Sequence, residues 1–331
     1  MKREILVEAV NLRKLFPVTR GFFATLFSKK QLFVHAVEDV SFQIRAGETL
    51  GLAGESGSGK TTTGRLALRL IEPTSGRMLI RGRDIFSLKG KELERIRREM
   101  QIIFQDPYES LNPGMTIFDT VAEPLAIHGI GRNFAEREQL VSEALDLVEL
   151  TPPREFFYRY PHELSGGQRQ RVCIARALVL KPNFIVADEP VASLDVSIRA
   201  QILNLLKSLQ RRLGLSYLYI SHDLGSVRYV SHKVAIMYLG KIVEYAKADE
   251  FFENPLHPYA KMLMAAIPVP DPTSRKTRLT LAGEIPSAIS PPSGCRFHTR
   301  CPRVMSVCRK MKPRLVAVGR EHLVACHLFT G

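Results

Sequence analysis

The sequence contains no run of 18 or more apolar residues. A helix needs about 20 such residues to cross a bilayer, so no spanning helix is indicated. The amino end, "MKREILVEAVNLRKLF", carries charges among its apolar positions, which argues against a signal peptide. We therefore expect a cytosolic, soluble chain. Its 331 residues, 45% apolar and 24% charged, suit one large globular domain with an appendage, or two domains.

Acidic residues are scarce near the carboxyl end. Residues 271–331 hold eleven Lys or Arg against three Asp or Glu, a net +8 within a chain whose formal charge is +14. Such a surplus attracts nucleic acid, an anionic membrane surface or an anionic ligand. We favour a solvated basic face beside a membrane.

A glycine-rich stretch, "TLGLAGESGSGKTTTGRLALRL", has the order of a buried strand, a loop and a helix. Its glycines let backbone N–H groups turn inward around phosphate oxygens, and the helix beginning near Lys60 adds its positive end. Lys60 would reach the terminal phosphates, and Thr61 would offer a hydroxyl to Mg²⁺. The predicted phosphate loop comprises Gly54, Glu55, Ser56, Gly57, Ser58, Gly59, Lys60, Thr61 and Thr62.

Two adjacent carboxylates follow the apolar run at residues 184–187 in "KPNFIVADEP". This run suits a parallel strand buried on both faces, and ligands of open α/β sheets bind at the carboxyl ends of such strands. Neighbouring side chains on a strand point in different directions, so the two acids need different roles. We expect Asp188 to hold Mg²⁺, through water, and Glu189 to polarise the water that attacks the γ-phosphate.

The segment "ELSGGQRQRVCIARALVLKP" predicts a helix, because Val172, Ile174, Ala175 and Leu178 recur at helical intervals. Ser165, Gly166 and Gly167 then lie at its amino terminus, a second potential anion site. One ATP does not need two such sites from one chain. Cys173 lies within the helix and is expected in the core.

Taken together, these motifs resemble the ATP-binding subunits of ABC transporters. The Walker A motif matches residues 54–61, the Q-loop Gln105 in "IIFQDP", the LSGGQ signature residues 164–168, the Walker B motif residues 184–188, and the H-loop His222 in "YISHDL". In that family the signature of one subunit covers the γ-phosphate held by the phosphate loop of another. The resemblance thus implies two ATP molecules sandwiched between two ATPase subunits.

The resemblance implies further roles. Glu189 would be the catalytic glutamate, His222 would contact the γ-phosphate, and Gln105 would touch Mg²⁺ or the lytic water and report the state of the site to a membrane subunit. Asp195, in "SLD", would belong to a loop that crosses the dimer interface. The signature residues that face nucleotide would be Ser165, Gly166, Gly167 and Gln168.

The adenine contact is the least defined part of the motif set. Phe16 in "VNLRKLFPV" is the candidate for stacking on the base, since aromatic faces suit such stacking. The family more often has Tyr there, and an insertion, "PVTRGFFATLFSKKQLFV", follows it. Phe16 could equally belong to the core.

The expected fold is α/β, an ABC-type P-loop NTPase with a RecA-like core, an antiparallel β subdomain and a helical subdomain at about 106–178 that carries the signature. Strands are predicted near 4–10, 36–44 and 48–53, with a strand pair in "GRMLIRGRDI". Residues 1–245 would form the ATPase domain. Residues 246–331 would form a carboxyl-terminal extension, beginning with a proline-rich wrap or linker.

Four of the five cysteines fall in the extension with the spacing C-x5-C-x6-C-x17-C. Disulfides are improbable in a cytosolic ATPase, because that compartment keeps thiols reduced. The C-x2-4-C pairs usual for zinc are absent, whereas iron–sulfur clusters accept more varied intervals. A cluster, zinc and plain thiols all stay open on this reasoning. The cysteines are Cys295, Cys301, Cys308 and Cys326.

The carboxyl-terminal region also resembles that of the oligopeptide and dipeptide importer ATPases, as do "GESGSGKTT", "FQDPYESLNP" and "DEPVASLDVSIRAQILNLL". In some members of that group the four cysteines bind a [4Fe-4S] cluster, which the resemblance therefore implies here, with zinc less favoured. "VASLD" departs from the usual pattern, in which Ser precedes Ala, but keeps Asp195.

The predicted function is ATP hydrolysis, with Mg²⁺, that drives peptide uptake at the cytoplasmic face of the inner membrane. The implied partners are a second, different ATPase subunit, two transmembrane permease subunits and, indirectly, an extracytoplasmic solute-binding protein. Nickel or oligosaccharide are alternative substrates. A soluble ABC ATPase acting on nucleic acid or ribosomes is the alternative function, although such proteins generally have tandem ATPase domains or a long coiled coil. No nucleic acid partner is expected.

Overall fold

A computed structural model describes residues 4–18, 31–266 and 284–329, so part of the insertion after Phe16 and part of the proline-rich segment lie outside the described residues. The chain divides into two compact units. Unit 1 comprises Met1–Val7, Ile44–Thr49 and Ile80–Ile220. Unit 2 comprises Glu8–Gln43, Leu50–Leu79 and Ser221–Gly331.

The strands of unit 1 form a parallel arrangement in the order β8-β7-β6. They are β6 (Met100–Ile103), β7 (Phe184–Asp188) and β8 (Ser216–Ser221), the last residue of which belongs to unit 2. All five residues of β7 are buried, as its uninterrupted apolar run predicts. A two-residue strand, β5 (Arg83–Asp84), precedes them in the chain.

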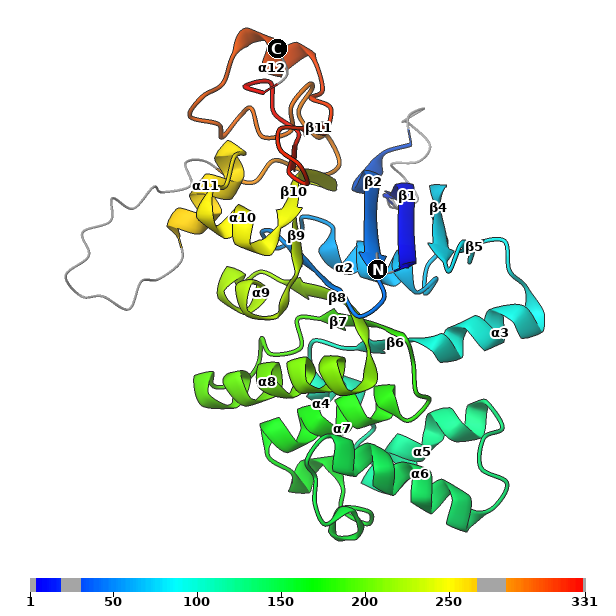
Figure 1. Cartoon of the computed structure of the whole chain (residues 1–331). Coiled ribbons are helices and arrows are strands. Elements are labelled where there is room, and N and C mark those ends of the chain that lie inside the picture. The colour runs from blue at the N-terminus through cyan, green and yellow to red at the C-terminus, as the bar shows by residue number, and fades with distance from the viewer. Residues whose placement is uncertain (1–3, 19–30, 267–283, 330–331) are drawn as a thin grey trace, which may run out of the picture. The chain divides into compact units, whose positions relative to one another are not determined.

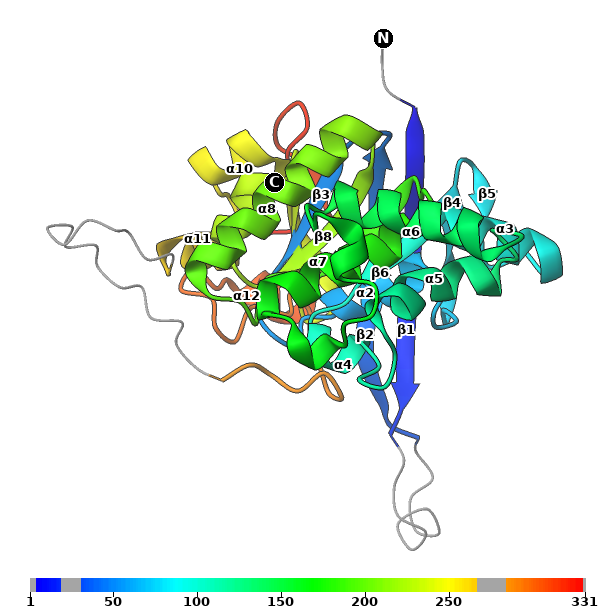
Figure 2. The same cartoon turned by 90° about the horizontal axis from the view of Figure 1, so that it is seen from below.

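The helices of unit 1 include α3 (Gly90–Glu99) and α4 (Pro107–Ser110), which flank β6 in sequence. α5 (Ile117–Ile127), α6 (Phe134–Leu147) and α7 (Gly166–Leu178) pack against one another, and α8 (Val196–Leu213) packs on α7 (Figures 1 and 2). Short 3-10 turns at Pro153–Glu155 and Pro161–Glu163 connect α6 to α7. Thr116 and Asn133 cap α5 and α6 by accepting backbone N–H groups.

The strands of unit 2 lie in two groups. In one, β3 (Thr49–Ala53) runs parallel to β9 (Lys233–Tyr238), and β10 (Lys241–Lys247), β12 (Leu323–Val324) and β11 (Val316–Ala317) continue with antiparallel pairing. In the other, β2 (Phe33–Arg45), β1 (Ile5–Pro17) and β4 (Ser75–Ile80) are neighbours in that order. The ends of β1, β2, β3 and β4 fall in unit 1. The predicted strand positions are confirmed.

The helices of unit 2 are α2 (Lys60–Ala67), α9 (Leu224–Val230), α10 (Ala248–Glu253), α11 (Pro258–Ala265) and α12 (Ser306–Lys310). The prediction that the proline-rich segment is only a wrap or linker is wrong over α11. Pro258 occupies the first helical position, where a missing N–H costs nothing, and the His257 side chain caps the helix. Tyr259 and Ala260 are fully buried.

The carboxyl-terminal segment, residues 284–329, is tied to the sheet. β12 pairs with β10 at Glu244 and Tyr245. His322 lies in a buried contact with Glu244, at 2.7 Å between Nε2 and Oε1, and reaches Glu250 with Nδ1 at 3.1 Å. Burial opposes protonation of this imidazole, but the two carboxylates outweigh it and raise the pKa of His322.

Glu38 on β2 holds a second part of the same segment. Its carboxylate, 7% exposed, accepts hydrogen bonds from Arg296 and from Lys312, the latter at 2.8 Å. Burial raises the pKa of Glu38, but Lys312, Arg296, His35 and Lys241 outweigh that effect and lower it to about 2. The expectation of a simply solvated basic face is therefore wrong for Arg296, which is buried.

None of the helices in the described ranges is long and apolar enough to cross a membrane. The boundary predicted at residue 245 stays a prediction. The pairing of β12 with β10 nevertheless joins the two sides of that boundary within unit 2.

Replacing Glu38 by Gln should lower the free energy of unfolding at pH 7 by about 3 kcal/mol, because the buried guanidinium of Arg296 would lose its counter-ion. The pKa of Glu38 falls from 4.5 to about 2 on folding, so its contribution is present above pH 4.5 and is lost as the pH falls toward 2. Urea unfolding of both proteins at a series of pH values tests this.

The difference in free energy of unfolding between wild type and Glu38→Gln should become smaller below pH 4.5. Glu72→Gln, at an exposed acid that pairs with Arg69, is the control and should change stability little. A difference that grows as the pH falls would contradict a stabilising role for the ionised Glu38 carboxylate.

Candidate active site

The phosphate loop is a tight turn between β3 and α2 in unit 2. Gly54, Gly57 and Gly59 have φ values of 155°, 75° and 103°. A Cβ atom at Gly54 would lie 2.2 Å from the carbonyl oxygen of Met237, so only glycine fits there. The tip of the loop, Ser56 and Gly57, is exposed, as access by phosphate groups requires.

Lys60 begins α2, as predicted, and its side chain is buried within the loop. Its Nζ donates to the carbonyl oxygens of Gly54 at 2.8 Å and Glu55 at 3.0 Å. The buried hydroxyl of Ser58 has no hydrogen-bond partner among the described residues. A charged amine and an unsatisfied hydroxyl beside N–H groups at a helix start fit a polyphosphate.

Two further predicted residues of unit 2 are accessible. Phe16 on β1 is 37% exposed, with the Lys14 ammonium 4.9 Å from its ring centroid, so it is not a core residue. This exposure is compatible with stacking on a base. His222 is exposed in the turn before α9, where Asp223 accepts the N–H groups of Gly225 and Ser226.

The paired acids occur in unit 1 at the end of β7. Asp188 is the last residue of the strand and is 6% exposed. Glu189 has a φ of 47°, an uncommon conformation for a residue with a side chain, and its N–H donates to the carbonyl of Ile220 at 2.9 Å.

The signature forms the amino terminus of α7 in unit 1. Ser165 caps the helix by accepting the N–H of Gln168 at 3.3 Å, and the Gln168 side chain accepts the N–H of Ser165 at 3.0 Å. A Cβ atom at Gly167 would lie 2.8 Å from Cγ2 of Ile198 on α8. Gly167 is therefore needed for helix packing, a reason that the sequence pattern does not reveal.

Gln105 and Asp195 are exposed loop residues of unit 1. Gln105 follows β6, and Asp195 precedes α8, whose first residue, Val196, is 81% exposed. The structure thus divides the predicted residues between the two units. Phe16, the phosphate loop and His222 lie in unit 2, and the other nucleotide residues lie in unit 1.

The four carboxyl-terminal cysteines are free thiols in unit 2. Burial, together with the nearby Cys308, Cys326 and Cys301, raises the pKa of Cys295 to about 11. Three of the sulfurs accept a hydrogen bond from the backbone N–H two residues further along the chain. The pairs are Cys295 with residue 297, Cys301 with residue 303, and Cys326 with residue 328. Within the described ranges, no three His, Cys, Asp or Glu side chains are close enough to hold a single metal ion.

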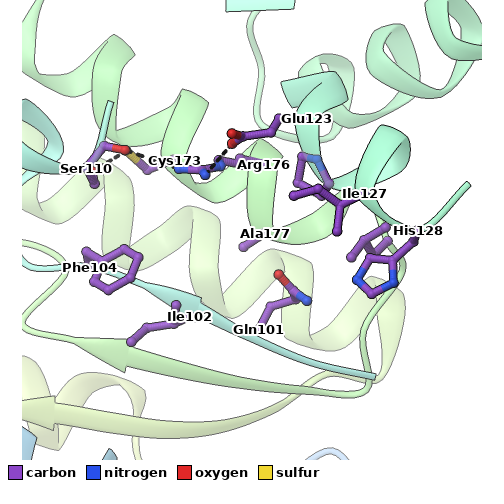
Figure 3. A pocket seen from close by; sticks show the side chains of 12 residues that line it. Gln101, Ile102, Phe104, Ser110, Glu123, Ile127, His128, Cys173, Arg176 and Ala177 are labelled. Atoms are coloured by element: carbon purple, nitrogen blue, oxygen red, sulfur yellow. Dashed lines mark hydrogen bonds and ion pairs between the residues drawn. The ribbon is translucent and has the colours of Figure 1, made fainter. Parts of the chain in front are cut away.

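A groove that the sequence did not predict lies in unit 1, with a volume of about 210 Å³ (Figure 3). Gln101, Ile102 and Phe104 line it from β6 and the segment after it, and Ile127 and His128 from the end of α5. Ile127 is 69% exposed and Phe104 is 43% exposed. The sequence of α5, IFDTVAEPLAI, does not by itself show which of its apolar side chains stay uncovered.

The signature helix forms another wall of this groove. Cys173 is buried, as predicted, with Sγ 3.3 Å from Oγ of Ser110, and burial raises its pKa to about 11. Arg176 binds the Glu123 carboxylate at 2.5 Å and the Ser110 carbonyl at 3.1 Å (Figure 3). One helix therefore carries the signature at its start and contacts the groove further along.

Comparisons with known proteins identify the family to which these nucleotide motifs and the carboxyl-terminal segment belong. Residues 37–192 match the ABC transporter family, and residues 243–308 match the "Oligopeptide/dipeptide transporter, C-terminal region". An ATP-binding cassette solved as a dimer in a post-hydrolysis state with ADP and Pi shares 30% identity, with a TM-score of 0.63 over 73% of this chain and 99% of that one. The chain belongs to the ATP-binding subunits of ABC transporters.

Curated relatives narrow the group. A probable peptide ABC transporter ATP-binding protein of Sinorhizobium fredii is 49% identical over 98% of this chain and 90% of its own length. The oligopeptide transport ATP-binding protein AppF of Bacillus subtilis is 46% identical over 99% of this chain and 98% of its own length. Within the ABC family, the chain belongs to the peptide and oligopeptide transporter ATP-binding subunits. The predicted family, fold class and ATP binding are thereby confirmed.

Two substitutions should separate nucleotide binding from hydrolysis. Lys60→Ala should weaken ATP binding by about tenfold or more, because a charge-assisted contact to phosphate is lost. Glu189→Gln should leave ATP binding within about twofold but lower turnover by about a hundredfold, because the amide cannot accept a proton from water. Equilibrium binding and phosphate release, measured on the assembled transporter, check both; unchanged turnover in Glu189→Gln would reject that residue as the base.

Proposed function

We propose that the chain hydrolyses ATP to drive the uptake of peptides, as a peripheral subunit on the cytoplasmic side of a membrane transporter. The likeness to peptide transporter ATP-binding proteins over nearly the whole chain carries this proposal. The same likeness favours transport over action on nucleic acid or ribosomes. The relatives' names favour peptides over nickel or oligosaccharide as the solute.

ATP would bind through its phosphates to the loop from Gly54 to Thr62, with Lys60 on the terminal phosphates and Phe16 stacked on adenine. The accessible loop tip, the buried Lys60 amine and the exposed Phe16 ring support these roles. Asp188 and Thr61 have the oxygen ligands that Mg²⁺ prefers, and Gln105 would reach the ion or the lytic water. The ion would neutralise charge on the phosphates, and Glu189 would take the proton from the attacking water.

A second ATPase subunit would complete each nucleotide site, with the signature of one subunit against the phosphate loop of the other. The exposed, capped start of α7 at Ser165 and the exposed Asp195 suit such a contact. His222 would add a contact to the γ-phosphate. A heterodimer of two different ATPase subunits is the assembly that we propose.

The groove of Figure 3 is the surface that we propose for a permease subunit, one of two in the complex. A transport ATPase must pass its nucleotide state to a membrane partner, and this groove joins the segment leading to Gln105 with the signature helix. Its exposed apolar side chains, Ile127 and Phe104, suit an apolar side chain of a cytoplasmic permease helix. An extracytoplasmic solute-binding protein would deliver the peptide.

The permease proposal predicts that Ile127→Glu prevents copurification of the ATPase with its permease subunits, because a carboxylate would be buried in an apolar contact. Leu213→Glu, at another exposed apolar residue of unit 1, is the matched control and should keep the complex. Thermal unfolding of each isolated chain checks that both variants fold. Normal assembly of Ile127→Glu would contradict docking in this groove.

We also propose that the four carboxyl-terminal cysteines bind a [4Fe-4S] cluster with a structural role. Backbone N–H groups directed at three of the sulfurs are well placed to stabilise thiolates. Cys301, Cys308 and Cys326 all act electrostatically on the Cys295 thiol, so the four sulfurs lie near one another, as ligands of one cluster would.

Protein purified without oxygen should be brown, absorb near about 400 nm and contain about four iron atoms per chain. Cys295→Ser should lose the absorbance and iron, because a ligand is removed. Cys173→Ser, which lies in unit 1, should keep both. Colourless wild-type protein with stoichiometric zinc would contradict the cluster.

A further inference from the structure

Glu55, the second residue of the phosphate loop, is held at two points by side chains from far along the chain. Its backbone N–H donates to the hydroxyl of Tyr259 on α11 at 2.9 Å. Its carboxylate accepts two hydrogen bonds from the Arg300 guanidinium, at 2.8 Å and 3.1 Å. This fork-to-fork geometry fixes both the position and the orientation of the carboxylate.

Arg300 is itself fixed. Its side chain is 4% exposed, and its guanidinium carbon lies 5.9 Å from the centroid of Tyr238. Tyr238, Tyr259 and Phe297 form a cluster of rings with centroids 4.7 to 5.4 Å apart. The hydrogen bonds to Glu55 raise the pKa of Arg300. The contact thus joins the phosphate loop to the carboxyl-terminal segment within unit 2.

The position of Glu55 matters for the rest of the loop. Its carbonyl accepts from Nζ of Lys60 at 3.0 Å and from the N–H of Ser58 at 3.2 Å. Gly54 precedes it and Gly57 follows shortly after, both with positive φ. Glycines restrict the backbone least, so local sterics alone do not fix this loop. The contacts from Arg300 and Tyr259 add restraint from outside the loop to these internal hydrogen bonds.

We propose that Arg300 is a positioning residue for ATP binding, through which the carboxyl-terminal segment holds the phosphate loop in the shape that receives phosphate. Arg300 acts on Glu55 and not on the nucleotide. Tyr259 supports the same residue through its hydroxyl. ATP affinity would then depend on the region that carries the four cysteines, independently of which solute is transported.

The experiment measures the dissociation constant of Mg-ATP for the purified full chain by equilibrium dialysis. Arg300→Ala should raise this dissociation constant by about tenfold. The loop would lose one charge-assisted contact, and the ligand would then have to order the loop on binding. Arg300→Lys should recover part of the affinity, since the lysine ammonium can donate to the Glu55 carboxylate but cannot form the two parallel hydrogen bonds of a guanidinium. Arg314→Ala, an exposed arginine of the same segment, is the control and should bind as wild type does.

A double-mutant cycle separates positioning from general destabilisation. In a Glu55→Ala background, Arg300→Ala should cause no further loss of affinity, because its partner is already absent. Tyr259→Phe removes one hydroxyl only and should raise the dissociation constant by a few fold, about two to five. Unchanged affinity in a folded Arg300→Ala chain, or an equal loss in both backgrounds, would overturn the proposal.

Discussion

Ion pairs with at least one buried partner, between acids of the nucleotide-binding region and bases of the carboxyl-terminal segment, organise much of unit 2. Glu38 binds Arg296 and Lys312, Glu55 binds Arg300, and Glu244 binds His322. Removing one partner of such a pair leaves a desolvated charge, which is far less favourable than the intact pair. These contacts tie the segment to the rest of unit 2. Its positive charge is matched locally at these points.

The nucleotide motifs could be predicted from sequence because they are local. The strand, glycine loop and helix from Thr49 to Ala67 are set by neighbouring residues, and the buried apolar run of β7 places Asp188 at its end. Backbone freedom at glycine and burial of a continuous apolar strand act over a few residues. The start of α7 is likewise local, because the side chains of Ser165 and Gln168 each accept the other residue's backbone N–H.

The long-range partners could not be predicted in this way. Nothing near Arg300 in the sequence indicates Glu55, since the two are 245 residues apart and an exposed and a buried arginine look alike in a charge count. The prolines around Pro258 favour a linker when they are only counted. Pro258 is nevertheless compatible with a helix, because it stands at the first position of α11. Gly167 looked like a ligand-binding glycine, although contact with Ile198 is what excludes a side chain there.

The distance in sequence between Glu38 and its partners has a consequence for synthesis on the ribosome. Glu38 emerges early, whereas Lys312 follows it by 274 residues, as their hydrogen bond shows. At ribosomal rates this is a delay on the order of tens of seconds. During that interval Glu38 lacks the counter-ions from residues 296 and 312. Once made, β10 lacks its pairing with β12 until residues 323 and 324 follow. The nascent chain therefore exposes an open sheet edge that only the last part of translation can cover.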